Sequence, residues 1–204
     1  VALAFALTEE AIEDNLYDTL SSRYTRALAR SMSTTKQVKA ANVLNNAFSS
    51  SFVGGDGKEL CATDHPTVGA GDLRNELATA ADLNETSLEQ ALIDIADFKD
   101  ERGLKVNAQA VRLIIPPALQ FVADRLMESQ GRVGTSDNDI NAIRNLGMIS
   151  GGYTVNNYLT DTDAFFIKTD VPNGLKHFVR TPVSTSMEGD FETGNVRYKA
   201  RELS

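Results

Sequence analysis

One stretch of the sequence decides the fold, namely TEEAIEDNLYDTLSSRYTRALARSMSTTKQVKAANVLNNAF, which runs from Thr8 to Phe48 without a glycine or a proline. Thr8 can cap a helix, and acidic side chains suit the positive N-terminal end of a helix dipole. The acidic residues that follow Thr8 are Glu9, Glu10, Glu13 and Asp14. A single helix over this stretch would be about 60 Å long. A compact globule of 204 residues has a diameter of roughly 43 Å, so the pattern predicts an elongated subunit.

Apolar residues spaced by four give this predicted helix a stripe that rotates slowly around its axis. They are Ile12, Leu16, Leu20, Tyr24, Leu28 and Met32, and the stripe resumes at Val38, Ala41, Leu44, Ala47 and Phe48. Polar residues from Ser33 to Gln37 interrupt it, and Thr34 with Gln37 matches a capping box that could start a second helix. We favour one long helix, kinked near Ser33 to Thr35, because no glycine or proline marks a turn there. Two antiparallel helices are the alternative.

Composition limits the possible classes of protein. A hydrophobic content of 42% is enough for a real core in one large or two small domains. No apolar run approaches the roughly 20 residues that span a bilayer, and Val1 to Leu7 lacks the pattern of a signal peptide. Because the chain begins with valine inside an apparent strand, we expect it to be a segment of a longer polypeptide. Its single cysteine, Cys61, excludes an internal disulfide.

The charge balance argues against one class of function. A net charge of −8, from 20 basic and 28 acidic residues, disfavours tight, sequence-independent binding to nucleic acid, which needs clustered lysine and arginine. Arg23, Arg26 and Arg30 form a small basic ridge on the predicted helix. A solvated face or ion pairs between subunits explain that ridge better than a DNA site.

The rest of the chain is predicted to be mixed. Ser49–Gly57 reads as a loop and Lys58–Asn84 as mostly irregular, which is typical of a binding loop or of a segment ordered by neighbours. Thr86, with Glu89 in a capping box, opens a helix that Gly103 stops. Its apolar face is Leu88, Ala91, Leu92, Ile95 and Phe98.

The remaining elements are predicted by apolar runs and turn signals. Val111–Ile115 reads as a buried strand, and Pro116-Pro117 starts a helix carrying Leu119, Val122, Ala123, Leu126 and Met127. Gly131 and Gly134 close that unit, and Asp137 can cap a short helix through Asn145. Further strands are predicted at Tyr153–Leu159, Ala164–Lys168 and Leu175–Arg180, followed by a hairpin of Val183–Phe191 and Asn195–Leu203 around Thr193-Gly194. In its second strand Val196, Tyr198 and Ala200 alternate with Arg197, Lys199 and Arg201, as in a sheet with one wet face.

The inventory of catalytic residues is thin, and we predict no catalytic, cofactor-binding or metal-binding residue. Cys61 and His65 are four apart, but neither an oriented base nor a third zinc ligand accompanies them. His177 reads as a packed or edge residue of a strand. Asp161 and Asp163 could bind a divalent cation, but a turn between strands explains them better. Asp137 and Asp139 are better explained as negative charges at the N-terminus of a helix. Gly69-Ala70-Gly71 and Gly54-Gly55-Asp56-Gly57 lack the remaining residues of a dinucleotide loop and of a phosphate loop.

Four groups of segments carry a recognisable pattern. They are LTEEAIED at Leu7–Asp14 with LNNAF at Leu44–Phe48; DGKEL at Asp56–Leu60 with Asp64-His65-Pro66; LIIPPAL at Leu113–Leu119; and YLTDTDAFF at Tyr158–Phe166, which leads to Gly174-Leu175 and to TGNVRYK at Thr193–Lys199. In this order and spacing, over nearly the whole chain, they resemble the major capsid proteins of tailed bacteriophages, nearest to the Mu-like major head subunit group.

The resemblance implies an α+β fold, the major capsid fold shared by tailed phages and herpesviruses. Residues 1–103 would hold the end of an extended loop, the spine helix at Thr8–Phe48 and the other elements of a peripheral domain, including its second helix at Thr86–Phe98. Residues 104–180 would form an α/β axial domain, and residues 181–204 a hairpin that returns to the peripheral sheet. The N-terminal arm and most of the extended loop of such proteins would precede Val1. Some members crosslink a lysine to an asparagine, but the loop lysine cannot be located here.

We therefore expect a structural protein and not an enzyme: a homo-oligomer of hexamers and pentamers in an icosahedral or prolate head, in the virion, around packaged double-stranded DNA. Contact with that DNA would be weak and non-specific, and portal, scaffold or decoration proteins are possible partners. No cofactor and no membrane are expected. The alternatives are an encapsulin-like shell that packages protein, a tail or baseplate subunit, and a small cytoplasmic enzyme that uses the Cys61/His65 loop.

Overall fold

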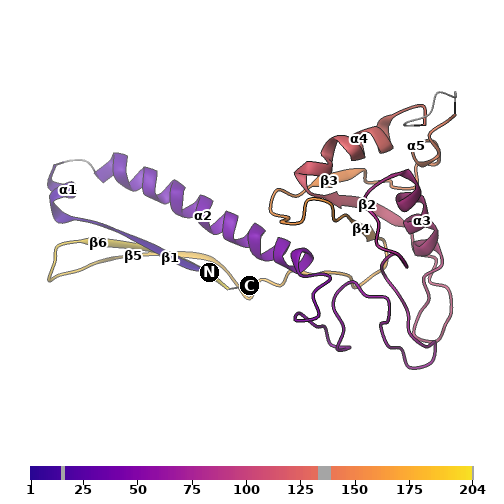
Figure 1. Ribbon diagram of the computed structural model, residues 1–204. Coiled ribbons are helices and arrows are strands. Elements are labelled where there is room, and N and C mark those ends of the chain that lie inside the picture. The colour runs from indigo at the N-terminus through magenta and orange to yellow at the C-terminus, as the bar shows by residue number, and fades with distance from the viewer. Residues whose placement is uncertain (15–16, 133–138, 204) are drawn as a thin grey trace. The chain divides into compact units, whose positions relative to one another are not determined.

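The computed structural model describes residues 1–14, 17–132 and 139–203, and the chain divides into two compact units (Figure 1). The first unit comprises Val1–Ala40 and Leu175–Ser204, and the second comprises Ala41–Gly174. The boundary after Ala40 falls inside a helix that is continuous from Tyr17 to Asn45. No helix among the described residues is long and apolar enough to cross a membrane.

The first unit packs a helix on a three-stranded antiparallel sheet. Its elements are β1 (Ala2–Leu7), α1 (Glu9–Glu13), α2 (Tyr17–Asn45) as far as Ala40, β5 (Thr181–Gly189) and β6 (Val196–Leu203). The strand order is β1-β6-β5, so the predicted closing hairpin is confirmed and β6 lies in the centre. Figure 1 shows α2 running along this sheet. The ring of Phe5 in β1 lies between those of Tyr198 in β6 and Tyr24 in α2, with centroids 5.0 and 5.5 Å away.

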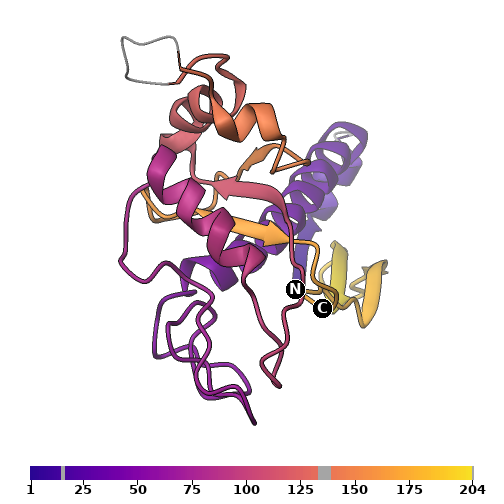
Figure 2. The same ribbon diagram turned by 90° about the vertical axis from the view of Figure 1, so that its right-hand side faces the viewer.

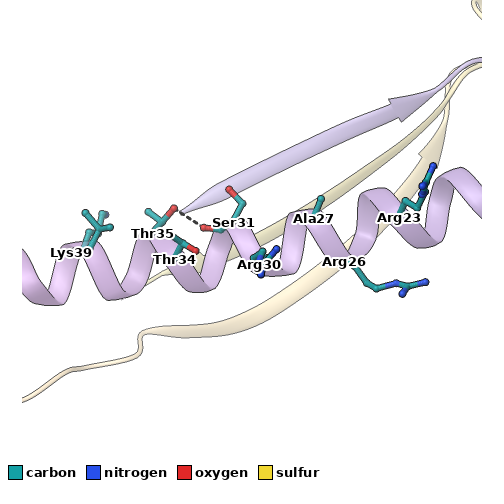
Figure 3. Close-up of a pocket in the computed structure, with 9 residues that line it drawn as sticks. Arg23, Arg26, Ala27, Arg30, Ser31, Thr34, Thr35 and Lys39 are labelled. Carbon is teal, nitrogen blue, oxygen red and sulfur yellow. Dashed lines mark hydrogen bonds between the residues drawn. The ribbon is translucent and has the colours of Figure 1, made fainter. Parts of the chain in front are cut away.

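The predicted long helix is confirmed over α2, which would be about 43 Å long for its 29 residues. It is unbroken through Ser33–Gln37, so the alternative of two helices divided at the Thr34/Gln37 box is wrong. Figure 1 and Figure 3 show a straight helix at Thr34 and Thr35, so the predicted kink there is also wrong. Ser33, Thr34 and Gln37 are exposed, and polar side chains on the solvent face of a helix do not interrupt it, while Thr35 and Lys36 have partners within the unit. The Thr35 hydroxyl donates to the carbonyl of Ser31 at 2.8 Å, and Lys36 pairs with Glu202 of β6 at 2.6 Å.

The start of the helix was predicted less well. Thr8 does cap a helix, because its hydroxyl accepts from the amide of Ala11 at 3.4 Å, but that helix is the short α1, which ends at Glu13. Negative charge is unfavourable at the C-terminal end of a helix dipole, where Glu13 and Asp14 lie. Of the apolar stripe, Leu16 lies outside the described residues.

The second unit is an α/β body around a small mixed sheet. Its elements are α3 (Glu85–Ala96), β2 (Ala110–Ile115), the 3-10 turn η1 (Pro117–Leu119), α4 (Gln120–Glu128), α5 (Ala142–Leu146), β3 (Tyr153–Val155) and β4 (Phe166–Thr169). The strand order is β3-β2-β4, with β2 parallel to β3 and antiparallel to β4. Helices α3, α4 and α5 lie around this sheet (Figure 2). The core gathers Leu88 of α3, Leu113 and Ile115 of β2 and Ala123 of α4, all fully buried.

Several predicted boundaries in this unit need correction. Helix α3 begins at Glu85, with Asn84 as its cap and Ser87, not Glu89, completing the capping box. It ends at Ala96, well before Gly103. Helix α5 is capped by Asn141, while Gly134 and the predicted cap Asp137 lie outside the described residues. Strand β3 is shorter than the predicted Tyr153–Leu159, because the chain turns after Val155.

The segment Leu175–Arg180, in the first unit, contains no strand, although its apolar residues predicted one. All six of its residues are exposed, so nothing in the unit covers an apolar face there. The long irregular stretch after Phe48 is confirmed, since residues 49–84 contain neither a helix nor a named strand.

Candidate functional site

Cys61 and His65 do not form a catalytic pair. Burial raises the pKa of the Cys61 thiol to about 11, so the thiolate is disfavoured at neutral pH. Nδ1 of His65 lies 2.6 Å from Oδ2 of Asp56, and its Nε2 has no hydrogen-bond partner. A base that activates the thiol would have to bond to it, and neither ring nitrogen of His65 is bonded to Cys61.

The other candidate residues are also separated or form turns. The amide of Asp163 donates to Oδ1 of Asp161 at 3.3 Å, which makes the local turn that the sequence predicted. The hydrogen bond between the two carboxyl groups lowers the pKa of Asp161 and raises that of Asp163. His177 is exposed in the irregular segment before β5. Asp139 precedes the Asn141 cap of α5, outside the first turn of that helix. Within the described residues, no three histidine, cysteine or acidic side chains gather as a metal site would require.

The glycine-rich loops serve local structure. The amide of Gly54 donates to the carbonyl of Lys58 at 2.6 Å, and Asp56 accepts from the amide of Lys58 at 3.2 Å. Asp56 thus bonds both to this turn and to His65, and hydrogen bonding to His65 lowers the pKa of Asp56. Lys58 in turn pairs with Asp64. These contacts fold the loop at residues 54–58 back on itself.

A different feature stands out, namely a shallow groove, open to solvent, along the exposed face of α2. Its lining is Arg23, Arg26, Ala27, Arg30, Ser31, Thr34, Thr35, Val38 and Lys39 (Figure 3). Arg26 bonds back to Ser22, with Nη2 donating to the hydroxyl at 2.7 Å, and Figure 3 shows the cationic side chains spread over successive turns. The groove contains the predicted basic ridge and extends it to Lys39.

The stretch of sequence that contains this groove carries only positive charge. From Thr19 to Gly55 the sequence has five cationic residues and no acidic one; they are Arg23, Arg26, Arg30, Lys36 and Lys39. Because the whole chain carries −8, subtracting these five positive charges leaves −13 for the rest. The basic ridge was predictable from its three arginines, but the absence of acidic residues around them is the stronger signal in the sequence.

The end of α2 is fixed within the second unit by an interaction that the sequence did not reveal. Nδ2 of Asn45 donates to the carbonyl of Tyr158 at 3.1 Å, and its Oδ1 accepts from the amide of Thr160 at 3.0 Å. Beyond Asn45, the ring of Phe48 stacks on that of Phe166 with centroids 5.7 Å apart. The geometry is that of a structural anchor between a helix end and a loop, without a reactive group.

Comparison with known families decides the class. The family model described as phage capsid protein matches residues 1–203. The chain belongs to the phage capsid protein family. Searches of curated proteins and of solved structures gave no match. The chain is therefore a structural subunit of the virion, and its family self-assembles into a shell. The mixed helices and small sheets of the two units are compatible with such a protein.

Proposed function

We propose that this capsid protein forms hexamers and pentamers that close into an icosahedral or prolate head around double-stranded DNA. The proposed fold is the one shared by tailed phages and herpesviruses, and the proposed subgroup is the Mu-like major head proteins. The long α2 on its antiparallel sheet supports a peripheral domain with a spine helix. Helices α4 and α5 and the mixed sheet β3-β2-β4, which lie within residues 104–180, support an axial domain there.

The main support for this proposal is the separation of charge between the cationic stretch of α2 and the acidic remainder of the chain. Identical subunits packed side by side can place the cationic groove of α2 against acidic surface of a neighbour, and each contact then uses two different faces. Heterologous contacts of this kind generate rings when the rotation closes. The strongly acidic remainder also suits a shell that encloses DNA without binding each phosphate, because tight binding needs many Lys or Arg contacts.

Charge reversal in the groove tests the proposal. In the triple variant Arg23→Glu, Arg26→Glu, Arg30→Glu, we expect shell yield to fall sharply while the helix content and the unfolding transition of the unassembled subunit change little. These side chains are exposed, which is why folding should tolerate the change. The triple Arg→Lys variant keeps the charge and is the matched control. An unchanged shell yield in the Arg→Glu variant would show that the groove plays no part in assembly.

The cargo needs a separate measurement. Nuclease-protected double-stranded DNA inside purified particles would support the phage head. Particles that contain a single foreign protein and no DNA would instead indicate a shell for protein cargo.

A further inference from the structure

A tight turn with the sequence VPNG ends the second unit at residues 171–174. Pro172 and Asn173 are its central residues, and Asn173 has a positive φ of 65°. Proline at the second position of a turn and a positive φ at the third are the pattern of a type II turn. The local sequence therefore accounts for the turn, because asparagine tolerates the left-handed conformation better than most residues.

The same turn places two groups that can react with each other in adjacent residues. Asn173 is the only asparagine of the sequence that is followed by a glycine. The backbone nitrogen of that glycine can reach the side-chain Cγ of the asparagine, because the bond closes a five-membered ring and glycine has no side chain to obstruct it. All four residues of the turn are exposed to water, and the amide of Gly174 has no backbone acceptor among the described residues. The reaction needs no second copy and no other segment of the chain.

We propose that Asn173 is a site of spontaneous deamidation, which converts this turn to an isoaspartyl or aspartyl linkage. The nitrogen of Gly174 loses its proton and bonds to Cγ of Asn173, and the bond from Cγ to Nδ2 breaks. Nδ2 takes up that proton and leaves as ammonia, so that a succinimide ring remains. Water then opens the ring. Opening at Cγ gives aspartate, and opening at the backbone carbonyl gives isoaspartate, whose main chain passes through Cβ and Cγ.

A second asparagine with a positive φ shows what favours Asn173. Asn107 has a φ of 54°, but the residue after it is Ala108, which is buried with 4% exposure. The Cβ of an alanine obstructs attack by its own nitrogen, and burial restricts the rotation that the attack requires. We therefore expect Asn107 to remain asparagine under conditions in which Asn173 reacts.

The aspartate-glycine pair at Asp56 is protected in another way. Its carboxylate lies 2.6 Å from Nδ1 of His65 and accepts from the amide of Lys58 at 3.2 Å. An ionised carboxylate is also a poorer target for a nitrogen nucleophile than a neutral amide is. The structure thus holds one of the two candidate side chains away from ring closure.

The fold around the turn can accept the product. Residues 175–180, which follow it, contain no strand and are all exposed. A longer backbone at residue 173 therefore breaks no ladder of hydrogen bonds, and the new carboxylate is not buried. The net charge changes from −8 to −9, because one neutral amide becomes one carboxylate. We expect the modified subunit to stay folded.

Ageing of the full-length, unassembled protein in mildly alkaline buffer tests the site. Peptide mass spectrometry locates each conversion of asparagine to aspartate, and labelling by an isoaspartyl methyltransferase reports isoaspartate. We expect both products at Asn173, with isoaspartate in excess. Gly174→Ala should slow the reaction about fivefold, because the added Cβ restricts the backbone of the attacking amide. Folding should tolerate this change, since a Cβ at Gly174 would meet its nearest atom, the carbonyl oxygen of Val171, at 4.0 Å.

The unfolded chain in guanidinium is the reference for the native turn. Because exposed turns open at almost no cost in free energy, we expect the native rate at Asn173 to stay within about fivefold of the unfolded rate. Asn173→Gln, whose longer side chain would have to close a six-membered ring, is the control and should give neither product. An intact Asn173 in native protein whose unfolded chain deamidates would overturn the proposal, as would equal conversion at Asn107 or an unchanged rate in Gly174→Ala. All of these measurements use unassembled protein, so their outcome is separate from that of the proposed shell.

Discussion

Removing one partner of the ion pair between Lys36 and Glu202 should destabilise the first unit measurably. Nζ of Lys36 lies 2.6 Å from Oε1 of Glu202, whose side chain is 4% exposed, while that of Lys36 is 36% exposed. At this distance two unit charges attract by about 6 kcal/mol at an effective dielectric constant of 20, and by about 1.6 kcal/mol in water. Because Lys36 is partly solvated, the lower part of that range applies, and we expect a coupling energy of about 2 kcal/mol.

A double-mutant cycle measures this coupling directly. The free energy of unfolding in urea would be compared for the unassembled wild-type subunit, Lys36→Met, Glu202→Gln and the double variant. Lys36→Met should cost the most, about 2–3 kcal/mol, because it leaves a buried carboxylate without its cation. Lys39→Met, in the exposed groove one turn later, is the control and should change stability by less than about 0.5 kcal/mol. A coupling energy below about 0.5 kcal/mol would refute the reasoning.

Two further predictions concern the second unit. Cys61 should react with thiol reagents much more slowly in the native subunit than in urea, and equally fast labelling in both states would contradict the burial. Stability should fall as pH rises from about 9 to 11, because the unfolded thiol, with its ordinary pKa of 9.0, loses its proton first. Cys61→Ala should weaken that pH dependence, and the remainder would come from Lys58 and Tyr153, whose pKa values are also raised. Asn45→Ala should cost about 1–2 kcal/mol of unfolding free energy, because it removes the partners of Tyr158 and Thr160, whereas Asn46→Ala loses only a bond to its own helix; equal losses would contradict the anchor.

The long helix was predictable because its signal is local. The absence of glycine and proline, with apolar residues at helical spacing, predicts a long helix from this stretch alone. The sequence pattern left open whether polar Ser33–Gln37 would break the helix, since the same residues fit both a capping box and an exposed helix face. The partner of Lys36 was not predictable, because Glu202 lies far away in sequence.

The predictions that failed depended on contacts that the local sequence pattern does not contain. The apolar residues of Leu175–Arg180 predicted a strand, but a strand needs a neighbour to pair with, and the sheet of the first unit ends at β5. Cys61 and His65 looked like a possible pair by spacing alone, yet Asp56, nine residues away, holds the imidazole.

Assembly is the central claim, and electron microscopy of the full-length protein, expressed alone and with its neighbouring genes, tests it most directly. We predict closed shells with five- and six-fold capsomers in negative stain, together with light scattering from particles far larger than a subunit. A monodisperse monomer or small oligomer under every condition would contradict the account.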